Sequence, residues 1–527
     1  MTDRQGYDVA VIGYGPTGVT AANLLGASGL SVVVIERDTS IYSRARAIST
    51  DEEVLRIWQQ AGLAERLKAD MLADKAVDFV DADGESFISA SPQPRGHGHP
   101  PQLFIYQPAL EQTLRDGVTR YPNVEVLLEH ECLRVQQDAG GVELLLARLG
   151  EDTLTRVRAS YVIAADGGSS PVRGQLGIGF DGRTYEDRWV VIDTEVRSEW
   201  PAHDRLRFHC DPSRPAVDCP TPLGHHRWEF PVLPGEDEQE LVTDAAVWRL
   251  LGRQGITERQ VKILRAVVYR HHVRFASRWR AGRIFLAGDA AHVMPPWIGQ
   301  GMAAGVRDAG NLCWKLAGVV SGRLPESVLD SYETERQPHV RGMTRRAVAV
   351  GRIITERRPL LTTIRNAVFR GVRSIGPLSG GLQKSAWIPD VHYAQGFLAD
   401  GRTRARGRKI PQPWVRDGAG ARARLDDVLG AGWVVVHHGP APDTSAWTRA
   451  GATVVEILSP GSRARDGAVV DDGDVLADWL RRHRASALVL RPDRVVYAAA
   501  APGESLSSPP TGLRATSSSA DRQPVRR

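Results

Sequence analysis

The chain of 527 residues is predicted to be an α/β protein in which an antiparallel sheet interrupts a parallel one. An apolar run at residues 7–13 precedes a helical pattern and a second apolar run at 30–36, which indicates β-α-β. The equally apolar runs 161–166 and 283–289 are typical of parallel strands covered on both faces. Between these two runs, residues 205–235 alternate polar and apolar side chains, which favours a half-exposed antiparallel sheet.

These patterns predict an order of domains along the chain. A stretch rich in Gly and Pro reads as a linker, and the last residues have the polar, Ser- and Pro-rich composition of a disordered tail. The predicted segments are the first part of the parallel-sheet domain (1–174), an inserted β-sheet domain that would hold the substrate (175–275), the second part with a helical segment (276–375), the linker (376–397), a small α/β domain (398–502) and the tail (503–527).

Composition and charge exclude several classes of function. The net charge is +5, but basic residues are scattered among acidic ones, so nucleic-acid binding is not expected. The four cysteines lack CxxC or metal-ligand spacing, which predicts no metal site and a reduced, cytoplasmic protein. No secretion signal and no apolar run of about 18 residues is evident. The arginine-rich stretch 326–372 could touch a membrane, but a solvated helix face is favoured, so no stable membrane association is expected.

A Gly-x-Gly-x-x-Gly motif follows the first strand and opens the first helix. In dinucleotide-binding folds, Gly13 would allow the tight turn, Gly15 the approach of a pyrophosphate, and Gly18 close packing of helix on strand. Glu36 ends the next strand, where a carboxylate can hold the two hydroxyls of a ribose and disfavours a 2′-phosphate. The sequence therefore predicts a Rossmann-like domain that binds FAD or NAD.

Two acidic residues at strand ends decide between these cofactors in favour of FAD. Asp166 and Asp289 follow the third and fourth parallel strands and can reach the hydroxyls of a ribitol chain, which NAD lacks. Gly299 and Gly301 then open a long helix whose backbone N–H groups suit the negative charge of a reduced flavin. For the Gly-x-Gly-x-x-Gly motif at residues 13–18, the alternative to dinucleotide binding is an ordinary glycine-rich turn.

Together these motifs resemble the group A flavoprotein aromatic hydroxylases, the para-hydroxybenzoate hydroxylase-like family. The resemblance covers about residues 7–345 and is nearest to the 3-(3-hydroxyphenyl)propionate hydroxylases. The region 398–502 is similar to the family's thioredoxin-like appendage, although it contains no cysteine. The motifs that carry the resemblance are the Gly-rich turn with Glu36, "RARAI" (44–48), "QPALEQTL" (107–114), "AADGGSSPVR" (164–173) and "GDAAHVMPPWIGQGMAAGVRDAGNLCWKLA" (288–317).

The resemblance implies an FAD-dependent monooxygenase that uses NADH or NADPH and O2. Such an enzyme hydroxylates a small phenolic substrate via a flavin C4a-hydroperoxide, and the likeness to the phenylpropionate branch implies a 3-(3-hydroxyphenyl)propionate-like acid here. For this chain, a homodimer is a further expectation beside the cytoplasmic location. Many relatives carry Asn or Cys where this chain has Ala303 or Ala304, which leaves substrate placement open. The predicted cofactor-binding residues are Gly13, Gly15, Gly18, Glu36, Arg46, Gln107, Asp166, Arg173, Asp289, Pro296, Gly299, Gly301 and Met302.

Substrate contacts are expected from the inserted sheet. Alternation places Arg205, Arg207 and His209 on one face of a strand, so Arg207 and His209 are catalytic candidates if that face lines the site; otherwise they face solvent. Trp228 is a further candidate, on the opposite face from Arg227 and Glu229. Which face lines the site stays open at this point.

Two other functions remain in view. A related oxygenase could tailor a polycyclic aromatic natural product by hydroxylation, epoxidation or Baeyer–Villiger oxidation. A non-catalytic FAD-binding module is disfavoured because every flavin-facing motif is intact. The choice between NADH and NADPH stays open.

Overall fold

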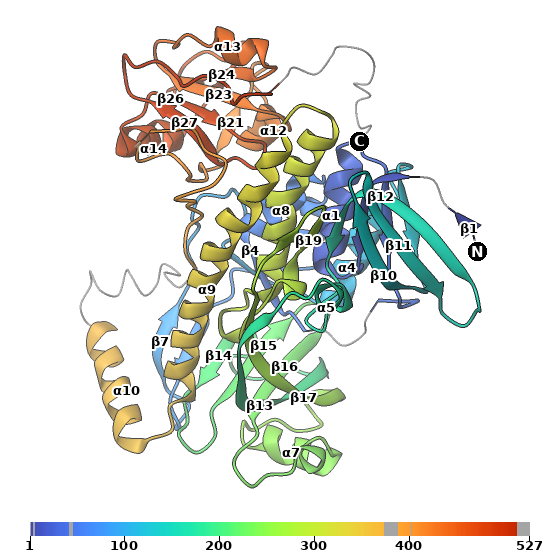
Figure 1. Ribbon diagram of the computed structural model, residues 1–527. Helices are drawn as coiled ribbons and strands as arrows, with labels where there is room; N and C mark the ends of the chain where they lie inside the picture. Colours follow the sequence, from blue (N-terminus) through green and yellow to red (C-terminus); the bar gives the residue numbers. More distant parts are fainter. Residues whose placement is uncertain (1, 4–5, 42–45, 374–387, 402, 514–527) are drawn as a thin grey trace. The chain divides into compact units, whose positions relative to one another are not determined.

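A computed structural model describes residues 2–3, 6–41, 46–373, 388–401 and 403–513 (Figure 1). By its internal contacts the chain divides into two compact units, Met1–Gly310 with Arg336–Pro389, and Asn311–Glu335 with Asp390–Arg527. The second unit therefore includes residues 311–335, which the sequence interpretation assigned to the parallel-sheet domain.

The first unit contains the predicted parallel sheet. Its parallel strands run in the order β19, β12, β2, β3 and β9, and β10 and β11 extend the sheet in antiparallel fashion from β12. All four apolar runs of the sequence are strands here, and α1 connects β2 to β3 as expected. The elements are β2 (Tyr7–Ile12), α1 (Pro16–Ala27), β3 (Val32–Ile35), β9 (Val124–Leu127), β10 (His130–Asp138), β11 (Gly141–Arg148), β12 (Leu154–Ala164) and β19 (Ile284–Leu286).

A second sheet of the same unit has eight strands in the order β20-β17-β13-β16-β15-β14-β6-β7. The predicted boundaries of 175–275 miss three of these strands, because β6 and β7 come from much earlier in the chain and β20 follows β19. β6 pairs with β14 in parallel, so the sheet is mixed rather than purely antiparallel. The strands are β6 (Val77–Val80), β7 (Ser86–Ala90), β13 (Phe180–Val196), β14 (Leu206–His209), β15 (Ala216–Thr221), β16 (His225–Pro231), β17 (Val261–Ala276) and β20 (His292–Val293).

Helices and one small sheet complete the first unit. The sheet pairs β4 (Ser49–Asp51) and β5 (Leu72–Ala73) with β8 (Gln102–Phe104). Two helices, α8 and α9, begin or end in the second unit. The helices are α2 (Glu52–Gln60), α3 (Ala64–Lys68), α4 (Gln107–Val118), α5 (Pro171–Gln175), α6 (Glu238–Leu241), α7 (Asp244–Gly252), α8 (Gly301–Val320), α9 (Ser331–Thr355) and α10 (Pro359–Arg373).

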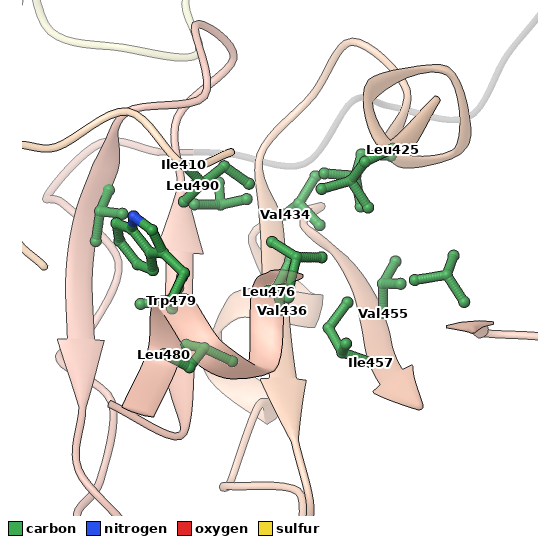
Figure 2. Close-up of a cluster of buried hydrophobic side chains, with 14 of the residues drawn as sticks. Ile410, Leu425, Val434, Val436, Val455, Ile457, Leu476, Trp479, Leu480 and Leu490 are labelled. Carbon is green, nitrogen blue, oxygen red and sulfur yellow. The ribbon is translucent and has the colours of Figure 1, made fainter. Parts of the chain in front are cut away.

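The second unit is a smaller α/β structure with a seven-stranded sheet in the order β22-β21-β25-β24-β23-β26-β27. Strands β25, β24 and β23 are parallel, whereas β26 and β27 form an antiparallel pair next to β23. Apolar side chains of β23, β24 and α14 form its core (Figure 2). The elements are β21 (Trp414–Arg416), β22 (Arg422–Arg424), α12 (Leu425–Leu429), β23 (Val434–His438), α13 (Ser445–Arg449), β24 (Thr453–Leu458), β25 (Ala468–Val470), α14 (Val475–His483), β26 (Ala487–Leu490) and β27 (Val496–Ala500).

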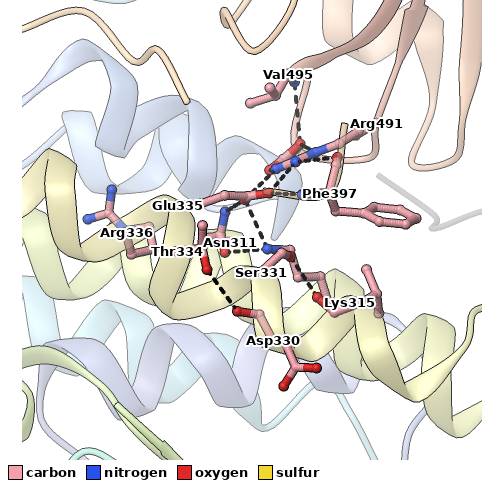
Figure 3. A network of polar contacts seen from close by, with 12 residues as sticks. Asn311, Lys315, Asp330, Ser331, Thr334, Glu335, Arg336, Phe397, Arg491 and Val495 are labelled. Atoms are coloured by element: carbon pink, nitrogen blue, oxygen red, sulfur yellow. Dashed lines mark hydrogen bonds and ion pairs between the residues drawn. The ribbon is translucent and has the colours of Figure 1, made fainter. Parts of the chain in front are cut away.

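A buried ionic cluster lies within the second unit (Figure 3). The carboxylate of Glu335 accepts hydrogen bonds from Asn311 (2.7 Å), Lys315 (2.9 Å) and both terminal nitrogens of Arg491 (2.7 and 2.9 Å). Burial alone would raise the pKa of Glu335, but the charges of Arg491 and Lys315 outweigh it and lower that pKa to about 2. Residues 311–335 thus join the C-terminal region through paired buried charges.

Two predictions about irregular segments need correction. Most of the predicted linker, residues 376–387, lies outside the described residues, but Val391 and Tyr393 are buried against Val495 instead of forming an open linker. The predicted disordered tail begins with ordered chain, because Leu506 and Leu513 pack on a core cluster and Trp447 donates to the Ser507 carbonyl (2.8 Å). Residues 514–527 lie outside the described residues.

Two further features bear on the membrane and metal predictions. In the part of the chain that the structure describes, no helix is long and apolar enough to cross a membrane. No group of three or more His, Cys, Asp or Glu side chains in those ranges is arranged to hold a metal ion.

Candidate functional site

A cavity of about 410 Å³ lies in the first unit, between the carboxyl end of the parallel sheet and the eight-stranded sheet. One wall is formed by the Gly-rich turn, the segment 46–51 and the segment 289–302, and the other by side chains of β6, β14, β15 and β16. Its volume is in the range of small-molecule sites. Each wall is described in turn.

The three glycines of the first motif have three different surroundings. A Cβ on Gly13, whose φ is +97°, would stand 2.4 Å from the Ala165 carbonyl oxygen, and one on Gly18 would stand 1.9 Å from that of Gly13. A Cβ on Gly15 would meet nothing within 4 Å, and Gly15 lines the cavity. No side chain caps α1 among the described residues, so its first N–H groups are open to the cavity.

Glu36 fixes this turn from the end of β3. Its carboxylate accepts hydrogen bonds from the backbone N–H groups of Tyr14 (2.7 Å) and Asp38 (3.0 Å). The side chain is half-buried and does not line the cavity. A contact between Glu36 and a ribose stays a prediction.

Arg46, Gln107 and Asp289 meet at the cavity. The amide oxygen of Gln107 accepts from the backbone N–H groups of Arg46 (2.7 Å) and Ala47 (2.8 Å), so Gln107 positions the Arg46 segment. The guanidinium of Arg46 lies 4.0 Å from the carboxylate of Asp289, and both side chains are partly exposed to the cavity. Removal from bulk water raises the pKa of Asp289, and the nearby His292 and Arg46 oppose this rise.

Asp166 and Arg173 lie behind the cavity wall rather than on it. Arg173 donates to the carbonyls of Ala290 (3.0 Å) and Gly168 (2.9 Å) and stacks on Phe180, with its guanidinium carbon 3.8 Å from the ring centre. Asp166 accepts from the Val172 N–H (3.1 Å), and burial raises the pKa of Asp166. Arg173 therefore joins the loop after β12 to the loop after β19, whereas the hydrogen bond of Asp166 lies within the loop after β12.

The segment that opens α8 is held by a buried carboxylate. Asp308 is fully buried and accepts from the Gly288 N–H (3.0 Å), His292 (2.7 Å) and Arg336 (2.9 Å). His292 is therefore a packed loop histidine. Four predicted cofactor residues of this segment line the cavity, namely Pro296, Gly299, Gly301 and Met302.

Gly299 explains the shape of this bend. Its φ is +63°, and a Cβ there would lie 2.1 Å from the Ser49 hydroxyl. α8 begins two residues later, at Gly301, where a Cβ would meet only Met294, at 3.9 Å. The first turn of α8 therefore opens onto the cavity wall, and its N–H groups can receive an anion there.

On the eight-stranded sheet, the face without the candidate residues lines the cavity, which decides the question that the sequence left open. Leu206 and Phe208 lie on the wall, with Val77, Phe79 and Val217, whereas Arg205, Arg207 and His209 do not. Arg205 pairs with Asp78 (3.1 Å) instead. The prediction that Trp228 contacts the substrate is also wrong, because Trp228 is fully buried in the core cluster on the far face of the sheet.

Arg207 and His209, the catalytic candidates, belong to a buried cluster around Asp218. The carboxylate of Asp218 is bonded by His209 (2.5 Å), Arg207 (3.0 Å) and His226 (3.1 Å). Burial would raise the pKa of Asp218, but these partners hold it far below its usual range. Both candidates are thus committed to a structural network away from the cavity.

Comparisons with known proteins now decide the family. Residues 6–347 match the family model described as FAD binding domain, and residues 407–509 match the model described as HcaD C-terminal domain. The chain is 38% identical over 515 residues to a 3-(3-hydroxy-phenyl)propionate/3-hydroxycinnamic acid hydroxylase of Burkholderia cenocepacia, covering 94% of each chain. The chain belongs to the FAD-dependent aromatic hydroxylase family.

This hydroxylase has further relatives of the same kind. A hydroxylase of the same name from Mycolicibacterium gilvum is 34% identical, covering 95% of this chain and 90% of the relative. Among solved structures, the anhydrotetracycline hydroxylase OxyS from Streptomyces rimosus is 26% identical with a TM-score of 0.74, covering 94% of this chain and 96% of that one. The monooxygenase PieE, solved with FAD and substrate, has a TM-score of 0.79 at 23% identity, covering 95% and 96%, and shows the fold.

The hydroxylase is therefore an FAD-dependent aromatic monooxygenase, with NADH or NADPH as the family's electron donor. The motifs on one cavity wall were found from the sequence, but the other wall was not. Glu229 lines the cavity from β16, and Trp297 lines it from the segment before α8. Alternation had placed Glu229 on the face opposite Trp228. Recognising Trp228 as a core residue would therefore have indicated that Glu229 faces the cavity.

Proposed function

We propose that this enzyme hydroxylates a phenolic ring with NADH or NADPH and O2, and that its substrate carries a phenylpropanoid acid side chain. The reaction is supported by the relatives at 38% and 34% identity that are named 3-(3-hydroxy-phenyl)propionate/3-hydroxycinnamic acid hydroxylases. The carboxylated side chain depends on those names alone. The observation that carries the proposal is one cavity with a glycine-built wall for the cofactor and an apolar wall for a ring.

The residues of the first wall fit FAD. Gly15 leaves the open approach that a pyrophosphate needs, and the uncapped first turn of α1 supplies N–H donors for its oxygens. We propose that Asp289 holds the ribitol and that Gly299, Gly301 and Met302 face the flavin ring with the positive end of α8. The buried members of the proposed cofactor set act by shaping the loops around the cavity. The remaining members of the set are Gly13, Gly18, Glu36, Arg46, Gln107, Asp166, Arg173 and Pro296.

When bound, FAD would supply the redox chemistry with the nicotinamide donor and O2 that the transfer of one oxygen atom to the ring requires. The protein binds, orients and keeps water out. The second wall suits this task because Phe79, Leu206 and Phe208 are apolar and almost fully buried. An aromatic ring that packs on them would be held over the opening of α8.

A second candidate is an oxygenase that tailors a polycyclic aromatic natural product. It is supported by the likeness in fold and sequence to OxyS, at 26% identity. Hydroxylation, epoxidation and Baeyer–Villiger oxidation all remain within this candidate. The substrate therefore has to be tested across ring sizes.

One experiment separates the candidates. NADH and NADPH oxidation would be followed with phenylpropionates, cinnamates, hydroxybenzoates and polycyclic phenols, and each product weighed by mass spectrometry. We expect faster flavin reduction with 3-hydroxyphenyl acids and a product heavier by one oxygen atom. A ring-expanded lactone, or turnover with polycyclic phenols alone, would contradict the phenylpropanoid proposal.

Three further expectations remain predictions. Cytoplasmic location is supported by four cysteines that are all buried and form no disulfide. A thioredoxin-like C-terminal domain is supported by the parallel strands of the seven-stranded sheet next to an antiparallel pair. A homodimer would be tested by sedimentation of the purified holoenzyme.

A further inference from the structure

Glu229 is an acidic side chain on the apolar wall of the cavity. It lies on β16 between Val191 of β13 and Val217 of β15, and its side chain is 14% exposed. Two other acids line the cavity among the described residues, and both have other tasks. Asp51 caps α2 and pairs with Arg307 (2.6 Å), and Asp289 belongs to the cofactor wall.

The carboxyl group of Glu229 has capacity to bind a ligand. Its nearest cation is Arg227, 4.0 Å away, which is beyond hydrogen-bond distance. Arg227 is directed elsewhere, since it donates to Asp193 (2.7 Å) and to the Arg46 carbonyl (3.1 Å). Within the described ranges, no side chain donates a hydrogen bond to Glu229. Its side chain, 14% exposed, therefore remains open to a ligand in the cavity that it lines.

The surroundings also make this carboxyl a stronger base than an exposed one. Burial raises the pKa of Glu229, Asp193 raises it further, and Arg227 opposes both. A carboxyl with a raised pKa is closer to the pKa of a phenol, so proton transfer between them costs less. The thiol of Cys219 on β15 is near, but burial raises its pKa, so it stays protonated.

We propose that Glu229 is the base that accepts the proton of the substrate's phenol. The phenolic O–H bond breaks, a carboxyl O–H bond forms on Glu229, and the electron pair stays on the phenolate oxygen. The ring thereby becomes electron-rich on the same wall that orients it. This inference rests on the proposed function, because it needs a phenolic substrate.

The test compares Glu229→Gln with the wild-type holoenzyme on a series of phenols of falling pKa, made by fluorine substitution. For the parent phenol we expect the rate of hydroxylation to fall about a hundredfold or more. Fluorinated phenols, which ionise without help, should recover most of that loss. The FAD content and the pH-independent affinity for substrate should change little.

Two further variants make the result specific. Glu195→Gln removes a half-exposed carboxylate of the neighbouring strand β13, which pairs with Lys262 at 3.8 Å, and should leave the rate unchanged. Glu229→Asp keeps a carboxyl group and should retain the wild-type pH profile of kcat/KM at a lower rate. A merely structural role would not separate Asp from Gln in this way.

The outcomes distinguish this inference from the proposed function. A wild-type enzyme that forms no hydroxylated phenol overturns both. If the wild type hydroxylates phenols, the role of Glu229 alone is overturned by either of two results with Glu229→Gln. One is an unchanged rate and pH profile, and the other is an equal loss for all phenols regardless of their pKa.

Discussion

Asp218 and Glu229 are two carboxylic acids on opposite faces of the same sheet. Asp218 lies on β15 and is fully buried, with two histidines and an arginine around it. Glu229 lies on β16 with its nearest cation 4.0 Å away. The pKa of Asp218 is held far below its usual range, whereas burial raises that of Glu229.

Both groups are removed from water, so burial does not distinguish them. The partners do, because hydrogen bonds and positive charge favour the ionised form and desolvation disfavours it. A fully partnered carboxylate can only stabilise the fold. A carboxylate whose countercharge lies 4.0 Å away is stabilised less in its ionised form and remains accessible to a ligand in the cavity.

The largest expected effect comes from Asp218→Asn. The change leaves Arg207 and two histidines buried without their carboxylate, so we expect about 3–5 kcal/mol of lost stability in urea unfolding. The wild-type contribution of Asp218 is present above the unfolded pKa, near about 3.9, and disappears as pH falls through the lower folded value.

The matched control for this variant is Asp181→Asn, at an exposed position of β13. It should change the free energy of unfolding by less than about 0.5 kcal/mol. A loss of less than about 1 kcal/mol in Asp218→Asn would show that its partners find water or other acceptors instead.

The next effect concerns the cofactor wall. Asp289→Ala should weaken FAD binding roughly ten- to a hundredfold, equivalent to about 1.5–3 kcal/mol for a charge-assisted bond. Flavin fluorescence during titration of the apoenzyme measures this. Glu229→Gln serves as the cavity control and should bind FAD as the wild type does. Equal FAD affinities in wild type and Asp289→Ala would remove Asp289 from the site.

A smaller effect of opposite sign is expected for the stability of Glu229→Gln. Because the folded pKa of Glu229 is raised, its contribution is present below the unfolded pKa, near about 4.3, and is lost as pH rises through the folded value. At pH 8 the Gln variant should therefore unfold at a higher urea concentration than the wild type, and the two should match at pH 4. A destabilised variant at pH 8 would mean that Glu229 supports the fold.

The smallest effect sharpens the contrast between adjacent residues of β14. Phe208→Leu should raise KM for an aromatic substrate. The rise should correspond to a loss of less than about 1 kcal/mol of binding free energy, because contacts between aromatic rings contribute about that much. His209→Asn should leave KM unchanged and lower stability instead. Steady-state kinetics and urea unfolding of the two variants measure this, and a KM change confined to His209→Asn would reverse the assignment of faces.

The sequence predicted one wall of the cavity well because that wall is made of backbone. Gly13, Gly15 and Gly18 can be located from their spacing, since only glycine fits where a Cβ would meet a carbonyl or a ligand. The parallel strands and α1 followed from apolar runs and periodicity.

The other wall could not be predicted in the same way. Alternation correctly separated Phe208 from His209, but the face that meets the cavity depends on which layer covers the other face. That layer includes Trp200 and α7, which form a core with Trp228. β6 and β7 join the sheet from about a hundred residues earlier, a pairing that no local pattern reveals.

The cluster around Glu335 constrains how the two ends of the second unit can evolve. Lys315 and Glu335 lie in the middle of the chain, and Arg491 comes from the loop after β26. A lineage that lost its C-terminal region would leave Glu335 and Lys315 buried without Arg491, at a cost of several kcal/mol. Substitutions at these positions should therefore occur together, and neutral residues at 315 and 335 would have to precede any shortening of the gene. The buried charges thus tie the C-terminal region to residues 311–335.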